Sequence, residues 1–158
     1  MIKIYTDGAC RGNPGPGGYG VVMIYGEFRK EMSDGFRETT NNRMELLSVI
    51  VALETLKKEG SSVTIYSDSK YVVDSVEKKW VFGWEKKQYK DKKNKDLWIR
   101  FLSIYRKHIV KFVWVKGHAS NKENNRCDEL AVAAATGRHL KTDDWFEQIG
   151  KKENEKLF

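Results

Sequence analysis

The fold is decided by residues 2–10, which read IKIYTDGAC and alternate in the manner of a β-strand. A Gly/Pro turn at residues 12–18 follows, and residues 19–25 and 28–36 then predict two further strands, so the chain begins as an antiparallel meander. Residues 63–67 and 110–116 predict a fourth and a fifth strand. Because a helix joins the first strand region to the fourth strand, the crossover rule makes those two strands parallel neighbours.

Segments with the apolar periodicity of a helix alternate with the later predicted strands. Residues 42–58 carry an apolar stripe that includes Leu46, Val49 and Leu53, and Gly60 follows as a stop signal. Residues 69–79, 96–107 and 124–136 predict three more helices. This order of elements predicts an α/β fold with a mixed sheet flanked by helices. Residues 1–140 are expected to form the domain, and residues 141–158 a short C-terminal appendage of it.

Composition limits the class of protein. With 158 residues, 40% hydrophobic and 32% charged, the chain is expected to be one globular domain and not a disordered segment. Its apolar stretches are too short to span a bilayer, and no signal-peptide pattern precedes the first strand. Cys10 and Cys127 lie far apart and suggest neither a disulfide framework nor a zinc site. We therefore expect a cytoplasmic protein without membrane contact.

Positive charge is concentrated in one segment. The net charge is +7, and residues 78–95 hold eight lysines against Glu85 and Asp91, which is +6 of that total. Aromatic residues interleave these lysines, at Trp80, Trp84 and Tyr89 among others. An amphipathic helix with a solvated lysine face is one interpretation, and a groove for a phosphate backbone and stacked bases is the other. We call residues 78–95 the basic handle.

One motif points to the wrong chemistry. Residues 15–20, GPGGYG, match the G-x-G-x-x-G pattern of dinucleotide-binding sites. The residues that follow predict a strand, whereas a dinucleotide site needs a helix N-terminus to hold the pyrophosphate. A hairpin turn is therefore the better interpretation.

Four carboxylates are expected to form a cluster. Singly, Asp7 could belong to an Asp-Gly turn, Glu45 to a capping box, Asp68 to an N-cap and Asp128 to a helix start. However, Asp7 and Asp68 follow neighbouring parallel strands, where ligand sites occur. Glu45 and Asp128 head helical rows predicted to face inward, which are Glu45, Val49, Ala52 and Leu56, and Asp128, Ala131, Val132 and Ala135. Buried unpaired carboxylates are costly, so the cluster predicts a hard divalent cation, Mg²⁺ or Mn²⁺.

Five runs of sequence then resemble type 1 ribonucleases H of the bacterial kind. They are YTDGACRGNPGPGG at residues 5–18, TTNNRMEL at 39–46, SDS at 67–69, WVKGHA at 114–119 and ENNRCDELA at 123–131. The resemblance covers about residues 2–136 in order. It implies a ribonuclease H-like fold with a five-stranded mixed sheet, three antiparallel strands and then two parallel ones. It also implies an Asp–Glu–Asp–Asp metal set at Asp7, Glu45, Asp68 and Asp128.

The resemblance implies further roles around this set. His118 matches the family's flexible-loop histidine and would transfer a proton or aid product release, and Glu123 is expected to assist near the metals. Asn13, Thr40 and Asn94 match contacts to DNA phosphates, and Cys10, Asn41 and Asn42 match positions near the scissile bond. The handle would supply the remaining substrate contacts, namely Trp80, Trp84, Lys86, Lys87 and Tyr89.

We expect an endonuclease that hydrolyses the RNA strand of RNA–DNA hybrids to 5′-phosphate and 3′-hydroxyl ends. The resemblance implies a mechanism with two Mg²⁺ ions, or Mn²⁺ in their place, in which Asp7 bridges both ions. Two alternatives stay open: another nuclease of the same fold, such as an integrase or resolvase, and a non-catalytic hybrid-binding module. The expected partner is the hybrid alone, without an obligate protein partner, so a monomer is expected.

Overall fold

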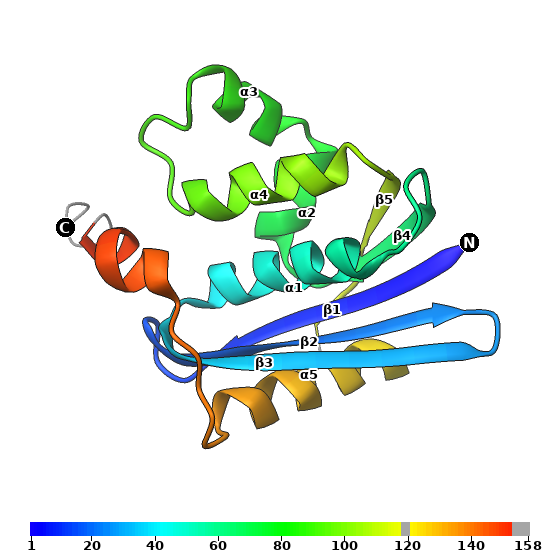
Figure 1. Cartoon of the computed structure of the whole chain (residues 1–158), viewed down its shortest axis with the longest axis horizontal. Coiled ribbons are helices and arrows are strands. Elements are labelled where there is room, and N and C mark those ends of the chain that lie inside the picture. Colours follow the sequence, from blue (N-terminus) through cyan, green and yellow to red (C-terminus); the bar gives the residue numbers. More distant parts are fainter. Residues whose placement is uncertain (118–120, 153–158) are drawn as a thin grey trace.

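The computed structural model describes residues 1–117 and 121–152, and within them one five-stranded sheet is flanked by helices (Figure 1). The strands are β1 (Ile2–Cys10), β2 (Gly15–Tyr25), β3 (Phe28–Thr39), β4 (Ser62–Ser67) and β5 (Ile109–Trp114). The helices are α1 (Asn41–Thr55), α2 (Lys70–Glu77), α3 (Trp80–Lys86), α4 (Lys95–Tyr105) and α5 (Lys122–Ala135), followed by a π-helical turn, η1 (Phe146–Gly150).

The sheet has the order β3-β2-β1-β4-β5. Strands β1, β2 and β3 pair antiparallel, whereas β4 pairs parallel to β1 and β5 pairs parallel to β4. This confirms the predicted fold class, including the parallel pairing of the first and fourth strands. Helices α1 to α4 cover one face of the sheet and α5 covers the other (Figure 1).

Several predicted boundaries were wrong by a few residues. The turn predicted at 12–18 is shorter because β2 begins at Gly15, and the third strand continues to Thr39 instead of ending at residue 36. The first helix ends at Thr55 and not at residue 58. There Leu56 adopts an extended conformation, with φ −64° and ψ 127°, and packs partly buried against the core, which explains why the apolar stripe runs on past the helix.

Within α1 the predicted row of Glu45, Val49 and Ala52 is buried, whereas the row predicted for α5 is buried only at its alanines. Val132 is 45% exposed, and the buried row of α5 is instead Cys127, Ala131 and Ala135. The reason is close packing against the sheet, since a Cβ placed on Gly18 of β2 would lie only 2.6 Å from the Ala131 carbonyl oxygen. Small α5 side chains therefore face the sheet, and Asp128 lies half-buried at the margin of this contact.

The segment after α5 returns to the sheet. The Lys141 amide donates to the Gly35 carbonyl at 2.8 Å, and the Arg37 amide donates to the Lys141 carbonyl at 2.9 Å, so residue 141 extends the outer edge of β3. Phe146 of η1 is 2% exposed. The expected division at residue 140 stays a prediction, but residues 141–150 pack against the sheet and α1.

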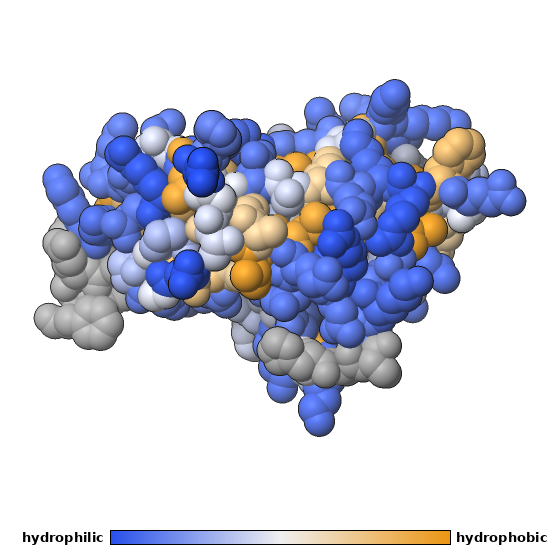
Figure 2. Space-filling model, turned by 90° about the horizontal axis from the view of Figure 1, so that it is seen from below, coloured by the Kyte–Doolittle hydropathy of each residue, from blue (hydrophilic) through white to orange (hydrophobic). Residues whose placement is uncertain are grey.

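The side of the molecule that carries α5 is largely hydrophilic (Figure 2). Seen from the side of α5, charged and polar residues dominate the surface, and hydrophobic residues form only a broken band across its middle (Figure 2). Among residues 1–117 and 121–152, no helix has the length and apolar character needed to cross a membrane.

Candidate active site

Parallel pairing of β1 and β4 brings two aspartates to one end of the sheet. Tyr5 is in register with Tyr66, and their rings stack with centroids 4.8 Å apart. Asp7 and Asp68 each follow two residues later, so Asp7 within β1 and Asp68 directly after β4 lie at the same level of neighbouring strands. Ligand sites form at the carboxyl ends of parallel strands, and β4 ends here.

A glycine brings Glu45 to the same place. A Cβ on Gly8 would lie 2.5 Å from the Glu45 amide nitrogen and 2.7 Å from the Met44 carbonyl carbon, so only glycine allows α1 to approach β1 this closely. Glu45 is 5% exposed and Asp7 8% exposed. One carboxylate oxygen from each of Asp7, Glu45 and Asp68 lies within 4.8 Å of the others.

The ordinary explanations for these acids do not apply. The N-cap of α1 is Thr40, whose hydroxyl accepts from the Arg43 amide, so Glu45 is not the partner in a capping box. The N-cap of α2 is Ser69 and not Asp68. Asp7 lies within β1 instead of a turn. Capping and turn formation therefore do not explain why these three acids lie where they do.

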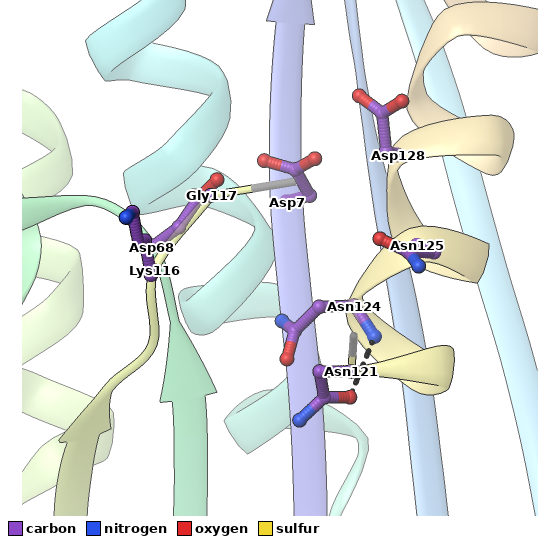
Figure 3. Close-up of a pocket in the computed structure, with 8 residues that line it drawn as sticks. All are labelled: Asp7, Asp68, Lys116, Gly117, Asn121, Asn124, Asn125 and Asp128. Atoms are coloured by element: carbon purple, nitrogen blue, oxygen red, sulfur yellow. Dashed lines mark hydrogen bonds between the residues drawn. The ribbon is translucent and has the colours of Figure 1, made fainter. Parts of the chain in front are cut away.

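Asp128 faces the same cavity from the opposite side of β1. It projects from α5 toward Asp7, while Asp68 lies beyond Asp7 on the far side (Figure 3). It lines a small cavity of about 20 Å³ with Asp7 and Asp68, but it lies outside the group of three whose oxygens are within 4.8 Å. The other lining residues are Lys116, Gly117, Asn121, Asn124 and Asn125.

The sequence did not identify Asn124. Its Nδ2 donates to the Tyr66 carbonyl at 3.3 Å, and its buried Oδ1 has no hydrogen-bond partner within the described residues. Asn121 is the N-cap of α5 and accepts from the Asn124 amide at 3.1 Å (Figure 3). A signal was available, since Asn124 precedes Asp128 by four residues and so lies on the same helix face.

Burial and mutual repulsion perturb the acids. Burial raises the pKa of Asp7 to about 7, with a further contribution from the charge of Asp68, although hydrogen bonds with Glu45 and the Gly8 amide act in the opposite direction. Burial also raises the pKa of Glu45 well above its ordinary value, and the Asp7 charge adds to this. Perturbation by desolvation plus like charges in a cavity is typical of functional sites.

The donor set fits a hard divalent cation. Glu45 Oε2 is buried and has no hydrogen-bond partner among the described residues, and the three converging groups offer only oxygen ligands. Oxygen is the ligand that Mg²⁺ and Mn²⁺ prefer. A cation held here would satisfy the unpartnered oxygen and offset the repulsion between the acids.

Five of the residues expected to bind substrate lie together at the start of α1. The Asn41 amide donates to Asn13 Oδ1 at 3.1 Å, which joins the β1–β2 turn to the helix. Cys10 lies against the same junction, with its thiol 3.5 Å from the Thr39 carbonyl oxygen. Thr40 and Asn42 flank Asn41 in sequence, and Asn42 is exposed. This group borders Glu45 of the acidic cluster.

The basic handle forms a second surface. Trp80 is 48% exposed, Trp84 is partly buried, and both line a groove of about 310 Å³ with Lys92 and Lys93. The Lys92 ammonium lies 5.0 Å from the centre of the Trp84 ring. Lys86 and Lys87 are exposed on the same segment.

Three other residues expected at the site are not placed there by the structure. Tyr89 is 7% exposed and belongs to the hydrophobic core, so it does not share the exposed surface of the handle. Glu123 accepts from Arg29 of β3 at 2.5 Å and is not among the residues that line the acidic cavity. His118 lies outside the described residues.

The fold and site together define an α/β protein of the ribonuclease H-like class, with an acidic group that could hold a metal. Comparison with known proteins agrees, because the family RNase H matches residues 1–136. The chain belongs to the ribonuclease H family, whose members are metal-dependent nucleases.

The relatives match over most of their length. The chain is 58% identical to Ribonuclease H of Desulforamulus reducens, over 90% of this chain and 92% of the relative. It is 49% identical to Ribonuclease HI of Synechocystis sp., over 92% and 94%. Among solved structures, LC9-RNase H1, a type 1 RNase H with the type 2 active-site motif, aligns with a TM-score of 0.79 and 31% identity over 96% of this chain and 82% of that one.

Proposed function

We propose that this protein hydrolyses the RNA strand of RNA–DNA hybrids and leaves 5′-phosphate and 3′-hydroxyl ends. The observation that carries the proposal is the group Asp7, Glu45 and Asp68, the first two buried, whose oxygens lie within 4.8 Å of one another in a chain that carries a lysine-rich handle. A protein that only binds nucleic acid gains nothing from acids beside phosphates, because they repel the ligand. The family supports hydrolysis, and LC11-RNase H1 was solved in complex with an RNA/DNA hybrid, aligning with a TM-score of 0.67 and 31% identity over 85% of this chain and 96% of that one.

Asp7, Glu45, Asp68 and Asp128 would hold the cations. Two bound Mg²⁺ ions, or Mn²⁺ in their place, would supply an activated water and charge stabilisation at the leaving 3′ oxygen. Asp7 lies between Asp68 and Asp128 (Figure 3) and close to Glu45, so it is the residue that we expect to contribute to both ion sites. His118 keeps its expected role in proton transfer or product release.

Discrimination between the strands would come from two surfaces. Glu45 borders the exposed start of α1, where its carboxylate can accept a hydrogen bond from a ribose 2′-hydroxyl, the group that distinguishes RNA from DNA. Thr40, Asn13 and Asn94 would contact phosphates of the DNA strand, and the handle would follow its backbone. Since these contacts are to backbone, we expect little sequence specificity.

A cleavage assay on end-labelled hybrid tests the proposal. We expect Mg²⁺-dependent cutting by the wild type and loss of cutting in Asp128→Asn, while Glu129→Gln, its neighbour on α5 with a 66% exposed side chain, cuts as the wild type does. Cutting of duplex DNA as readily as hybrid would support the integrase-like alternative. Binding without metal-dependent cutting would support the binding-module alternative. Ligation of the products to a 3′-hydroxyl acceptor reports the 5′-phosphate.

We also propose that the protein acts as a monomer in the cytoplasm. The two free cysteines, Cys10 and Cys127, support the cytoplasm, where reducing conditions keep thiols unpaired. Light scattering during size-exclusion chromatography, with and without hybrid, measures the mass directly. A dimer mass in the absence of hybrid would contradict the monomer.

A further inference from the structure

A buried arginine lies within the run that contains Glu45. Arg43 of α1 is 1% exposed, and all five of its guanidinium N–H groups donate hydrogen bonds. Nε and Nη2 donate to the two oxygens of Asp143 at 2.7 and 2.9 Å. Nη1 and Nη2 donate to the two oxygens of Asp96 at 2.8 and 2.7 Å, and Nη1 also donates to Asn94 Oδ1 at 3.4 Å. A lysine has three donors on one atom and cannot reproduce this fork.

The acceptors come from separate parts of the chain. Asp96 lies in the first turn of α4, where the handle ends, and Asp143 lies in the segment that follows residue 141. Asp143 is held in turn by the Thr39 hydroxyl at 2.7 Å, at the end of β3. In Figure 1 the C-terminal segment lies beside the first turns of α1 and α4, where these contacts form. Arg43 therefore joins β3, α1, the handle and the C-terminal segment.

Both ends of this network reach residues expected to bind a DNA phosphate. The Arg43 amide donates to Thr40 Oγ1 at 3.2 Å, and its guanidinium reaches Asn94. Asn94 has a left-handed backbone, φ 64°, and its Nδ2 donates to the Tyr71 hydroxyl at 3.0 Å. One residue thus contacts Thr40 through its backbone and Asn94 through its side chain, although the two are far apart in sequence.

We infer that Arg43 is a positioning residue that sets the distance between Thr40 and Asn94, and that Asp143 holds Arg43 for this task. The inference rests on the proposed function, in which Thr40 and Asn94 contact one phosphate region of the DNA strand. It gives residues 141–150 a role in substrate affinity without contact to substrate. Asp143 keeps Arg43 in place because a bidentate carboxylate fixes both the position and the plane of a guanidinium.

The direction in which Asp143→Asn changes KM distinguishes a positioning role from a purely electrostatic one. Replacing Asp143 by Asn removes a negative charge, which by charge alone would strengthen binding of a polyanion. Positioning predicts the opposite, a higher KM. We expect Asp143→Asn to raise KM for hybrid about five- to tenfold, the scale of one misplaced phosphate contact, with kcat changed less than about twofold.

The matched control breaks a different ion pair of α1, the one that it forms with α4 away from Arg43. Arg100 of α4 donates to both oxygens of Glu54 of α1, on the exposed side of that contact. Glu54→Gln removes the same charge and the same kind of pair, yet touches neither Thr40 nor Asn94. We expect it to leave KM and kcat unchanged. All variants are assayed well below their unfolding temperatures, so a loss of folded protein cannot be mistaken for weaker binding.

Modified substrates locate the effect. In a series of hybrids, each carries one uncharged methylphosphonate in the DNA strand. We expect wild type and Asp143→Asn to have equal KM when the methylphosphonate lies at one particular position. At the other positions Asp143→Asn has the higher KM, and we expect this difference to disappear when both proteins also carry Thr40→Ala. A penalty from Asp143→Asn that is the same for every hybrid, or a lowered KM, would overturn the inference. If the wild type fails to cut unmodified hybrid, the proposed function fails instead.

Discussion

Two buried charged clusters lie two residues apart on α1, and they are built in opposite ways. The cluster around Arg43 is satisfied internally, since every donor has an acceptor and two carboxylates surround one cation. The cluster around Glu45 consists of acids alone and leaves Glu45 Oε2 without a partner in the described part of the chain. The first cluster can stabilise the fold by itself, whereas the second needs a cation from solution.

Buried charges that are paired within the protein serve structure, whereas buried charges of one sign serve chemistry. Burying a charge is tolerated when paired groups and hydrogen bonds replace water. A cluster that lacks such pairing costs stability, and such sites are kept where a ligand will complete them. Removing a charge should therefore have opposite effects on folding in the two clusters.

Asp7→Asn should give the largest change. We expect cleavage of hybrid to fall by more than about 10³-fold, because the amide cannot replace a carboxylate as a shared ligand of two cations. The melting temperature of the metal-free variant should nevertheless rise by about 2–6 °C, since a buried like charge is removed. Calorimetry in chelator measures this. A lower melting temperature in chelator would show that the acidic cluster is not under repulsion.

Arg43→Met should change stability in the other direction. It leaves Asp96 and Asp143 without their cation, and breaking a buried pair in this way costs about 3–5 kcal/mol of unfolding free energy. Urea unfolding measures the loss. Arg100→Met is the matched control, because its pair with Glu54 is exposed and such pairs contribute less than about 1 kcal/mol. Equal losses in both variants would contradict the contrast.

These two clusters also differ in how far the sequence could predict them. Asp7 and Asp68 were predictable because strand order places them at one sheet end, and Glu45 because it heads a buried helical row. Arg43 and Asp143 are 100 residues apart, so no periodic pattern in the sequence predicts that they pair. For Asn124 the spacing to Asp128 was a usable signal, but its unpartnered Oδ1 is visible only in three dimensions.

The handle shows a second limit of sequence reasoning. Tyr89 stands among lysines and aromatics, and its position favours an exposed stacking residue, yet it is buried. The reason is backbone conformation, since Gln88 and Tyr89 both have positive φ, 55° and 57°, and the chain reverses there. Ordinary side chains in the left-handed region leave no clear signal in a sequence.

Gly8→Ala probes how closely the acidic cluster must pack. The added methyl group would meet the backbone of Met44 and Glu45, which cannot move without shifting α1. We expect a loss of about 1–3 kcal/mol of stability from overpacking. We also expect a fall in kcat of at least about tenfold, because Glu45 moves away from Asp7. Activity measured at temperatures where the variant is fully folded separates the two effects. Full activity in the folded variant would mean that the spacing of Glu45 is not critical.

The smallest expected effect is that of the cation on folding, and it tests the contrast most directly. At a Mg²⁺ concentration about ten times its dissociation constant, binding to the folded state alone adds about 1.4 kcal/mol, which raises the melting temperature of a chain of this size by about 3–6 °C. The rise should vanish in Asp7→Asn, because the ion then has lost its central ligand, and should persist in Asp143→Asn, because the Arg43 cluster holds no ion. Potassium chloride at equal ionic strength controls for screening of the net charge of +7. An equal rise in melting temperature with Mg²⁺ in wild type and Asp7→Asn would mean that the stabilising ion binds elsewhere. It would contradict the proposal that the cluster of Asp7, Glu45 and Asp68 is completed by a cation.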